Sequence, residues 1–331
     1  MEANNVIYAG TVGQGVWRSL DEGETFQRYC AGMFMEAVVR ALAVHPTDPK
    51  CLYAGTDAGL YRTQNGGESW ERLLNTPFDP GNGWAEGVAV WSLLIHPHNP
   101  DLIFVGTCPS ALYRSRDGGT TWEKLAAGLT PECAPIVYSR VTCLLADPDE
   151  LDTIWAGVEI DGVWRSRDAG DTWQRLSNGL SSTDIHGLAI VPGTPRSVYA
   201  TTNNDLNVSH DDGETWIPQQ VKRFFPHGYC RGIVAGAADP KTLLLGNGNG
   251  PPGTTGTLQV SRDGGATWQQ AALPQMPNST VWTFTVDPAA PSLVFAASIN
   301  GYLYRSRDGA TTWQKCAHEF GEVRALALVV Q

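Results

Sequence analysis

The sequence SRDGGTTW occupies residues 115–122, and the same eight-residue pattern occurs seven times along the chain. Written as Ser-x-Asp-x-Gly-x-Thr-Trp, it is most regular at residues 115–122, 166–173 and 261–268. Less regular copies lie at residues 19–26, 63–70, 209–216 and 306–313. The third positions of successive copies are separated by 44, 52, 51, 43, 52 and 45 residues. A period near the length of a four-stranded propeller blade predicts radial repetition of a β-sheet.

Each copy of the pattern has the composition of a tight turn. The side-chain oxygens of Ser or Thr, and of the Asp or Asn two residues later, accept backbone N–H groups within such turns. The Gly that follows supplies a positive φ, and the closing Trp, or Phe26 in the first copy, is large enough to pack between neighbouring sheets. Ala310 replaces this Gly in the last copy, so we expect slight strain there. We predict a purely structural role for these turns, with a bound cation or a polymer contact as the alternative.

Short apolar strands lie between the turns, and they assemble into blades of four strands, a to d, in which the repeated pattern joins c to d. Strand a ends at a Pro turn, as at Pro46 and Pro97, and six such turns accompany the seven repeats. The missing turn lies where the chain begins and ends: residues 6–11 form a strand b without a strand a, and residues 323–329 form a strand a with nothing after it. Pairing these two strands closes the ring and removes exposed sheet edges. The sequence therefore predicts an all-β fold, a single seven-bladed β-propeller domain over residues 1–331, with no linker and no appended module.

The repeat resembles the BNR or Asp-box repeat of sialidases, sortilin-type receptors, xyloglucan-cleaving glycosidases and the photosystem II assembly factor family. The resemblance covers essentially the whole chain and implies the propeller fold. It implies no particular chemistry, because one fold hosts many functions. Sialidases resemble six-bladed propellers that begin with an Arg-Ile-Pro segment, which this sequence lacks, and the xyloglucanases resemble two propellers in tandem. Seven blades with arginines around the central face are closer to the assembly-factor pattern.

Composition and charge restrict the classes of function. Hydrophobic residues make up 42% of the 331 residues, and the formal net charge is −11. Because no run of Lys and Arg forms a basic stripe, we expect neither nucleic acid nor an anionic membrane as a partner. The chain also has no apolar run long enough for membrane insertion and no leader sequence at its start. We therefore predict a cytoplasmic protein, or an exported one whose leader is absent from this chain.

Cysteine and histidine usage gives no sign of a cofactor. The seven cysteines are scattered, odd in number and without CxxC spacing, which suits a reducing compartment. Cys108, Cys133 and Cys230 fall in or near loops of one face, so a thiolate metal site remains an alternative. The seven histidines form no HxH or HExxH motif. We predict no metal and no cofactor.

The predicted functional site lies on the face with the long, irregular loops. In a meander the c-to-d and a-to-b turns share one end of the blades, and the other end carries the d-to-a and b-to-c loops, at residues 76–88, 126–139, 222–232 and 247–256. Long loops on a rigid scaffold are the expected place for binding or catalysis. Strand a lines the channel, and its first residue on this face is six residues before each Pro. The predicted ligand-binding residues at this mouth are Arg40, Trp91, Tyr138, Arg140, His186, Tyr229, Arg231, Trp282 and Arg324.

This set of side chains predicts a pocket for a small anionic or sugar-like ligand, or for a segment of a partner protein. Arginine binds a carboxylate through two N–H groups, and Trp offers a flat apolar face. By the same count, two blades contribute Thr142 and Val234. The structural alternative is that the Trp side chains plug the channel and the arginines pair with loop acids such as Glu36 or Glu322.

Whether the chain is an enzyme stays open at this level. A pair of carboxylates about 5 to 9 Å apart at the channel would favour a glycosidase, but the sequence selects no pair and contains no nucleophile signature. Our main hypothesis is a non-enzymatic binding or assembly module. The alternative is a glycoside hydrolase or lyase acting in the same pocket, with loop Glu or Asp as acid and base. The available acids are Glu36, Glu86, Glu159, Asp161, Asp184, Glu319 and Glu322.

Overall fold

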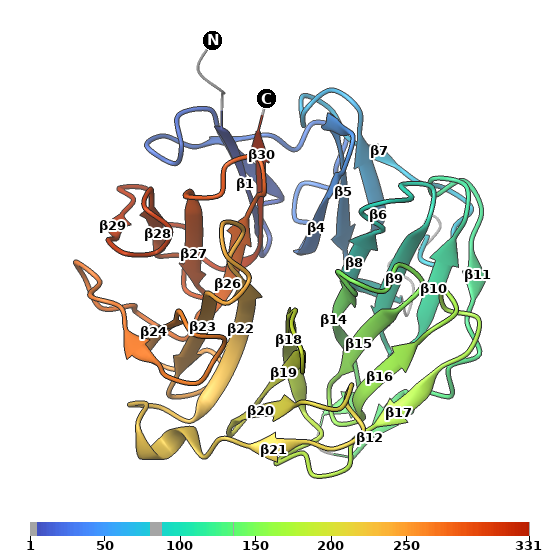
Figure 1. Cartoon of the computed structure of the whole chain (residues 1–331). Coiled ribbons are helices and arrows are strands. Elements are labelled where there is room, and N and C mark those ends of the chain that lie inside the picture. The colour runs from blue at the N-terminus through green and yellow to red at the C-terminus, as the bar shows by residue number, and fades with distance from the viewer. Residues whose placement is uncertain (1–4, 80–87, 135, 331) are drawn as a thin grey trace.

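The computed structural model describes residues 5–79, 88–134 and 136–330. Seven four-stranded antiparallel sheets surround a central axis (Figure 1). Within the described residues there is no α-helix, and a single turn of 3-10 helix, η1, covers Val221–Arg223. The predicted all-β fold, a seven-bladed propeller with four-stranded blades, is confirmed.

The blades follow one another along the chain, and each is built from the channel outward. From the inner to the outer strand, the first blade contains β30 (Val323–Val330), β1 (Asn5–Thr11), β2 (Val16–Ser19) and β3 (Gln27–Arg28), and the second contains β4 (Val39–His45), β5 (Asp48–Thr56), β6 (Gly59–Thr63) and β7 (Glu71–Arg72). In the same order, the third blade contains β8 (Ala89–Ile95), β9 (Ile103–Cys108), β10 (Leu112–Ser115) and β11 (Glu123–Lys124), and the fourth contains β14 (Val141–Ala146), β15 (Ile154–Val158), β16 (Gly162–Ser166) and β17 (Gln174–Leu176). The fifth blade contains β18 (Ile185–Val191), β19 (Ser197–Thr202), β20 (Leu206–Ser209) and β21 (Ile217–Pro218); the sixth contains β22 (Tyr229–Ala235), β23 (Leu243–Gly248), β24 (Gly256–Ser261) and β25 (Gln269–Gln270); and the seventh contains β26 (Val281–Val286), β27 (Val294–Ser298), β28 (Leu303–Ser306) and β29 (Gln314–Lys315). A small hairpin, β12 (Glu132–Cys133) and β13 (Val137–Tyr138), lies in one d-to-a loop.

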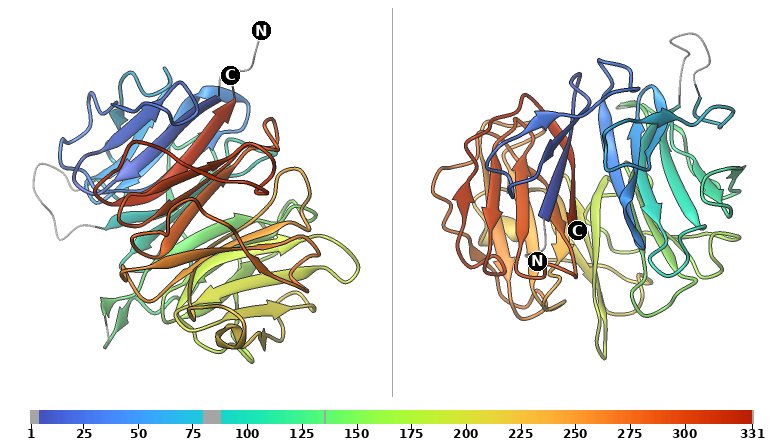
Figure 2. Two further views of the ribbon diagram at one scale, coloured as in Figure 1. Left: turned by 90° about the vertical axis from the view of Figure 1, so that its left-hand side faces the viewer. Right: turned by 90° about the horizontal axis from the view of Figure 1, so that it is seen from above.

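The first blade is completed by the two ends of the chain. Strand β30 pairs antiparallel with β1, with Val6 opposite Val329 and Tyr8 opposite Ala327. The two strands lie side by side in every view (Figures 1 and 2). The predicted closure is confirmed, and it makes β1 an interior strand of its sheet.

The repeated pattern forms the same hydrogen-bonded turn in all seven copies. The Ser or Thr hydroxyl accepts the backbone N–H at the fifth position at 2.7–2.9 Å. The Asp or Asn carboxylate or amide oxygen accepts the N–H at the seventh position at 2.8–3.0 Å. Backbone φ is positive at the fourth and fifth positions, as at Ala169 (53°) and Gly170 (93°). Ala310 is also held in the left-handed region, at 67°, so the expected strain in the last copy is confirmed.

An arginine directly before the turn links four blades to the next blade. Arg18 donates to the carbonyl oxygen of Gly66 at 2.5 Å and pairs with Glu68 at 2.7 Å. The same two contacts recur for Arg114, Arg165 and Arg305 with the turns that contain Asp171, Glu214 and Glu24. The paired acids are half exposed, so the ion pairs contribute little. The buried hydrogen bond to the turn carbonyl is the stronger link between blades.

Hydrophobic clusters fill the space between neighbouring blades. Trp70, which closes the second turn, is buried with Tyr8 of the first blade and Tyr61 of its own. Trp216 packs in the same manner against Trp155 of the preceding blade. The predicted wedge role of the closing aromatic residue is confirmed at these positions, and it fixes the spacing of the blades through apolar burial.

The two ends of the propeller differ as expected. The repeated turns contact the a-to-b turns, because Gly118 N–H donates to Asp101 and Gly264 N–H donates to Lys241. The opposite end carries the longer loops, including the β12–β13 hairpin and η1. Within the described residues, no helix is long and apolar enough to cross a bilayer.

We predict that Gly170→Ala lowers the free energy of unfolding by about 2–5 kcal/mol. A left-handed φ costs a non-glycine residue about 1–2 kcal/mol, and a Cβ at this position would lie 2.7 Å from Phe104, which adds a packing penalty of about 1–3 kcal/mol. Gly13→Ala is the matched control, since its φ is also positive, 71°, but nothing lies within 4 Å of the added Cβ. Urea unfolding of both variants measures the difference. Equal losses would show that the turn does not pack against the neighbouring blade as described.

Candidate functional site

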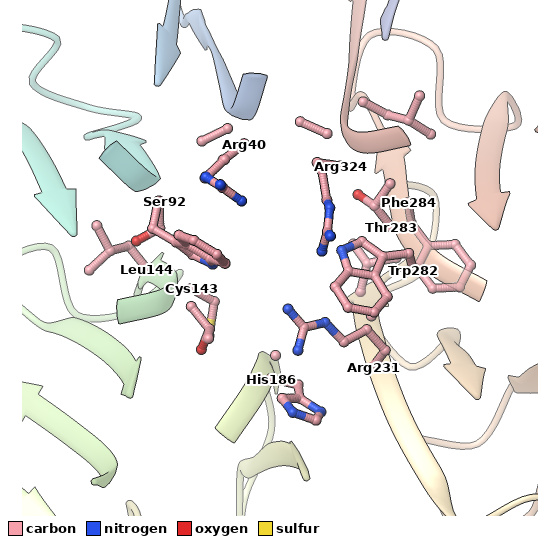
Figure 3. Close-up of a pocket in the computed structure, with 18 of the residues that line it drawn as sticks. Arg40, Ser92, Cys143, Leu144, His186, Arg231, Trp282, Thr283, Phe284 and Arg324 are labelled. Atoms are coloured by element: carbon pink, nitrogen blue, oxygen red, sulfur yellow. The ribbon is translucent and has the colours of Figure 1, made fainter. Parts of the chain in front are cut away.

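The channel opens on the loop side into a cavity of about 330 Å³. Six of the nine predicted ligand-binding residues line it, one from each of six inner strands, and Thr142 comes from the seventh. Figure 3 shows the side chains of Arg40, Arg231 and Arg324 pointing into the same space. The six are Arg40, Trp91, His186, Arg231, Trp282 and Arg324.

A β-bulge at the start of each inner strand places these side chains. The pairing register between the inner strand and the second strand skips one residue in six blades and two residues in β22. An extra residue in one strand locally redirects its side chain, and bulges are common next to functional sites. The skipped residues are Arg40, Trp91, Thr142, His186, Arg231 with Gly232, Trp282 and Arg324.

Counting back from the Pro turn gives the wrong register in one blade. It selects Val234, but the bulge in β22 lies at Arg231, and Val234 pairs regularly with Leu244. The last paired residue of β22 is Ala235, opposite Leu243, and more residues separate it from Pro240 than separate the inner strand from its Pro in the other blades. Counting back from the Pro assumes that this distance is the same in every blade, so the longer turn makes the count select a residue too far along β22. Val234 still lines the cavity, deeper in the channel than the bulge.

The two Trp side chains support the arginines. The guanidinium carbon of Arg40 lies 4.0 Å from the ring centroid of Trp91, and that of Arg231 lies 3.8 Å from the centroid of Trp282. Arg324 also lies over Trp282, at 4.9 Å. Such contacts are worth about 0.5–2 kcal/mol. The indoles therefore hold the cationic groups at the mouth, and the part of each ring that faces an arginine is not open to a ligand.

Positive charge is concentrated in the cavity. No Asp or Glu is among the described residues that line it. Arg324 pairs with Glu322, whereas Arg40 and Arg231 form no ion pair with any described carboxylate. Burial, followed by repulsion from Arg324, lowers the pKa of Arg40 to about 10, and burial also lowers the pKa of Arg324. Both groups remain protonated at neutral pH, and an anion bound between them would remove the repulsion.

The other three predicted residues lie outside this cavity. Arg140 stacks over Trp91 at 4.8 Å and pairs with Glu159 at 2.6 Å. The Tyr229 ring lies 4.9 Å from that of His186 and lines a second, neighbouring cavity. Tyr138 is 45% exposed on β13 and does not line either cavity. The sequence analysis placed all nine residues at one mouth, but Arg140, Tyr229 and Tyr138 do not line the cavity there. The ligand-binding role of the nine residues remains a prediction.

The loop acids have different environments, and most are occupied elsewhere. Glu319 pairs with Lys315 and Asp161 with Arg175, while Glu36 is exposed and makes no ion pair with Arg40. Glu86 lies outside the described residues. The structural alternative was that the channel arginines pair with loop acids. Arg324 does pair with Glu322, whereas Arg40 does not pair with Glu36. Two acids remain beside the cavity, Glu159 and Asp184.

Glu159 and Asp184 meet His186 between two blades. Glu159 directly follows β15, and Asp184 directly precedes β18, which carries His186. One oxygen of each carboxylate and one imidazole nitrogen lie within 4.8 Å of one another. Burial raises the pKa of Glu159 against the opposing effect of Arg140, and burial lowers the pKa of His186. The sequence shows Asp184-x-His186 but gives no signal that Glu159, a blade away, joins them.

The cysteines form no comparable group. All seven are free thiols, and the cluster of Glu159, Asp184 and His186 is the one set of potential metal ligands found in the described part of the chain. Cys230 is buried, and burial raises the pKa of its thiol. The alternative of a thiolate site formed by Cys108, Cys133 and Cys230 therefore has no support from the described structure.

Family comparisons identify the repeat. The family described as "Sortilin, neurotensin receptor 3" matches residues 14–142, and the "BNR/Asp-box repeat" matches residues 259–270. The predicted resemblance to BNR-repeat propellers is confirmed.

The curated relatives are larger proteins. The "Probable oligoxyloglucan-reducing end-specific xyloglucanase" of Neosartorya fischeri is 28% identical over 265 residues, which cover 77% of this chain and 30% of that protein. A xyloglucanase of Paenibacillus sp. is 26% identical over 308 residues, which cover 80% and 29%. The chain thus spans about a third of the length of the curated relatives it matches. These names support the carbohydrate-active alternative better than the main hypothesis of a non-enzymatic binding module.

Solved structures share the fold. The GH74 xyloglucanase of Xanthomonas campestris has a TM-score of 0.64 at 20% identity, covering 84% of this chain and 45% of that one. YCF48 bound to D1 peptide has a TM-score of 0.57 at 16% identity, covering 85% and 81%. At these identities the likeness establishes the propeller architecture and nothing about the ligand.

We predict that Arg40→Met raises the free energy of unfolding of the ligand-free protein by about 1 kcal/mol or more. Removing an unpaired, largely buried charge saves a desolvation cost of several kcal/mol, which exceeds the lost contact with Trp91 of about 0.5–2 kcal/mol. Arg140→Met is the matched control: it leaves Glu159 unpaired and should destabilise by about 2 kcal/mol. Chemical unfolding measures the free energy of unfolding of both variants. A clear loss of stability in Arg40→Met would show that the charge of Arg40 is compensated within the fold.

Proposed function

We propose that this propeller binds an acidic carbohydrate, such as a uronic acid residue of an oligosaccharide, at the loop-side mouth of its central channel. The observation that carries the proposal is the cavity with three arginines and no described carboxylate. Arg40, Arg231 and Arg324 point into one space, and two of them have no acidic partner within residues 5–79, 88–134 and 136–330. Guanidinium groups bind carboxylates strongly through paired N–H donors, so a ligand carboxylate is the missing counter-charge.

The size and lining of the cavity agree with a sugar acid. Its volume of about 330 Å³ falls at the lower end of the range for small-molecule sites, about 300–1,000 Å³. Thr142, Ser92 and His186 add polar groups beside the arginines. The carbohydrate part of the proposal rests on the curated relatives, which are named as xyloglucanases. The acidic part rests on the arginines, because a neutral glucan would leave their charges uncompensated.

A second candidate function is cleavage of such a carbohydrate. The specific observation is that Glu159 and Asp184 approach within 4.8 Å beside the cavity, close to the spacing of about 5–5.5 Å in retaining glycosidases. Burial raises the pKa of Glu159, which favours the protonated form that a general acid needs. At this spacing one carboxylate would act as the nucleophile and the other as the acid and base of a hydrolase, or the two would act as acid and base in a lyase. In either form the enzyme would be a glycoside hydrolase or a lyase.

We predict that uronic acids and their oligomers raise the melting temperature, whereas the matching neutral sugars do not. A ligand at a hundred times its Kd adds about 2.7 kcal/mol of stability. The double variant Arg40→Ala, Arg324→Ala should lose this shift, because the carboxylate receptor is removed. Equal shifts with galacturonate and galactose, or a shift that persists in the double variant, would contradict the proposed site.

Measuring enzymatic turnover distinguishes binding of the carbohydrate from its cleavage. If the chain cleaves the bound oligosaccharide, Glu159→Gln should lower kcat by at least about 100-fold, the usual contribution of acid–base catalysis, while binding measured by calorimetry persists. Reducing-sugar release and absorbance of unsaturated products report hydrolysis and elimination. Binding without any product in the unmodified protein would favour the binding function alone.

A further inference from the structure

The contact between His186 and Asp184 is chemically unusual. The imidazole Nδ1–H donates to the carbonyl oxygen of Cys230 at 2.9 Å, and a carbonyl oxygen can only accept. In the neutral ring the other nitrogen, Nε2, is therefore an unprotonated acceptor. It faces Asp184 Oδ1 at 3.3 Å. Two acceptors thus face one another in a place where a positive group would normally lie between them.

Burial makes this arrangement significant. Only 2% of the His186 side-chain surface is exposed, and Asp184 Oδ1 is buried without a hydrogen-bond donor among the described residues. Burial and the positive charge of Arg231 lower the pKa of His186. Water reaches neither atom freely. A buried lone pair aimed at a buried carboxylate costs free energy unless an electron-pair acceptor joins them.

We infer that Glu159, Asp184 and His186 form a binding site for one divalent transition-metal ion, with His186 Nε2 and one oxygen from each carboxylate as ligands. The three atoms lie within 4.8 Å of one another. Two ligands of an ion with bonds of about 2.0–2.2 Å are at most about 4.4 Å apart, so the two carboxylate side chains move inward when the ion binds. One nitrogen and two carboxylate oxygens suit Zn²⁺ or Mn²⁺, whereas Ca²⁺ takes only oxygen ligands.

The surrounding contacts are those that orient metal ligands. A ligating imidazole usually donates its second N–H to a carbonyl or carboxylate, as His186 does to Cys230. Ligating carboxylates are themselves hydrogen-bonded. Arg140 holds Glu159 Oε2 at 2.6 Å, which leaves Oε1 available. The backbone N–H of Asp184 donates to Ser182 at 3.2 Å and steadies the turn before β18.

Every charged group around the cluster affects its affinity. Arg140 contacts Glu159, and Arg231 acts electrostatically on both Glu159 and His186. Their positive charges oppose a cation, so we expect weaker binding than at a closed structural zinc site. The neutral Tyr229 ring covers His186 on one side. Asp184 remains 18% exposed, which gives the ion a route from the loop side.

The test uses the full chain after treatment with a chelator. Calorimetry should show one equivalent of Mn²⁺ or Zn²⁺ bound per chain, with no response to Ca²⁺, and pulsed electron paramagnetic resonance of the Mn²⁺ form should show one coordinated histidine nitrogen. Asp184→Asn and His186→Gln should each weaken binding at least tenfold. Asp149→Asn, which changes an exposed acid far from the cluster, should leave it unchanged.

Two further measurements keep the inference falsifiable. Metal-free Asp184→Asn should melt at or above the temperature of the unmodified protein, because the new amide N–H can donate to His186 Nε2. A lower melting temperature would mean that His186 is protonated and paired with Asp184, and would overturn the inference, as would absent Mn²⁺ and Zn²⁺ binding or binding that survives both variants. The metal site does not depend on the proposed ligand. The double variant Arg40→Ala, Arg324→Ala should lose uronate binding and keep the metal.

Discussion

The hydrogen bond that each repeated turn forms within itself is the interaction on which the rest of the structure depends. A Ser or Thr hydroxyl accepts the N–H at the fifth position in all seven copies, which locks two consecutive residues in the left-handed region. The locked turn presents one carbonyl oxygen to the preceding blade, where an arginine such as Arg165 or a tyrosine such as Tyr53 donates to it. The geometry of each turn therefore sets the angle between two neighbouring blades, and the seven angles together close the ring.

Structural and functional demands are separated at the two ends of the propeller. At the turn end the arginines form ion pairs with acids of the next blade, and the aromatic wedges are buried. The loop end carries unsatisfied groups: Arg40 and Arg231, which form no ion pair with the carboxylates that the structure describes, and a His186 nitrogen that faces another acceptor. Proteins retain such destabilising features where a ligand supplies the missing partner. The contrast between the ends is the physical reason to place function at the channel mouth.

The bulges explain how a regular sheet supports an irregular site. Without the skipped residue, alternation would direct every second side chain of the inner strand toward the neighbouring blade. The bulge directs Arg40, Trp282 or His186 to the channel and lets the strand resume its pairing. Because Asp184 lies two residues before His186, the same bulge brings the carboxylate cluster next to the cationic cavity. The two sites are adjacent but opposite in charge.

The sequence by itself determined the blade count, the four-stranded blades, the closure of the ring and five of the residues around the cavity, because each follows from a short repeated pattern with a fixed period. It could not decide the register of β22, since extra residues in the turn after a strand change nothing in the local pattern that precedes them. Nor could it show that Glu159 joins Asp184 and His186, or that Arg324 pairs with an acid while Arg40 pairs with none of the described ones. Those facts depend on how neighbouring blades are packed, and contacts between residues distant in sequence are set only when the ring closes.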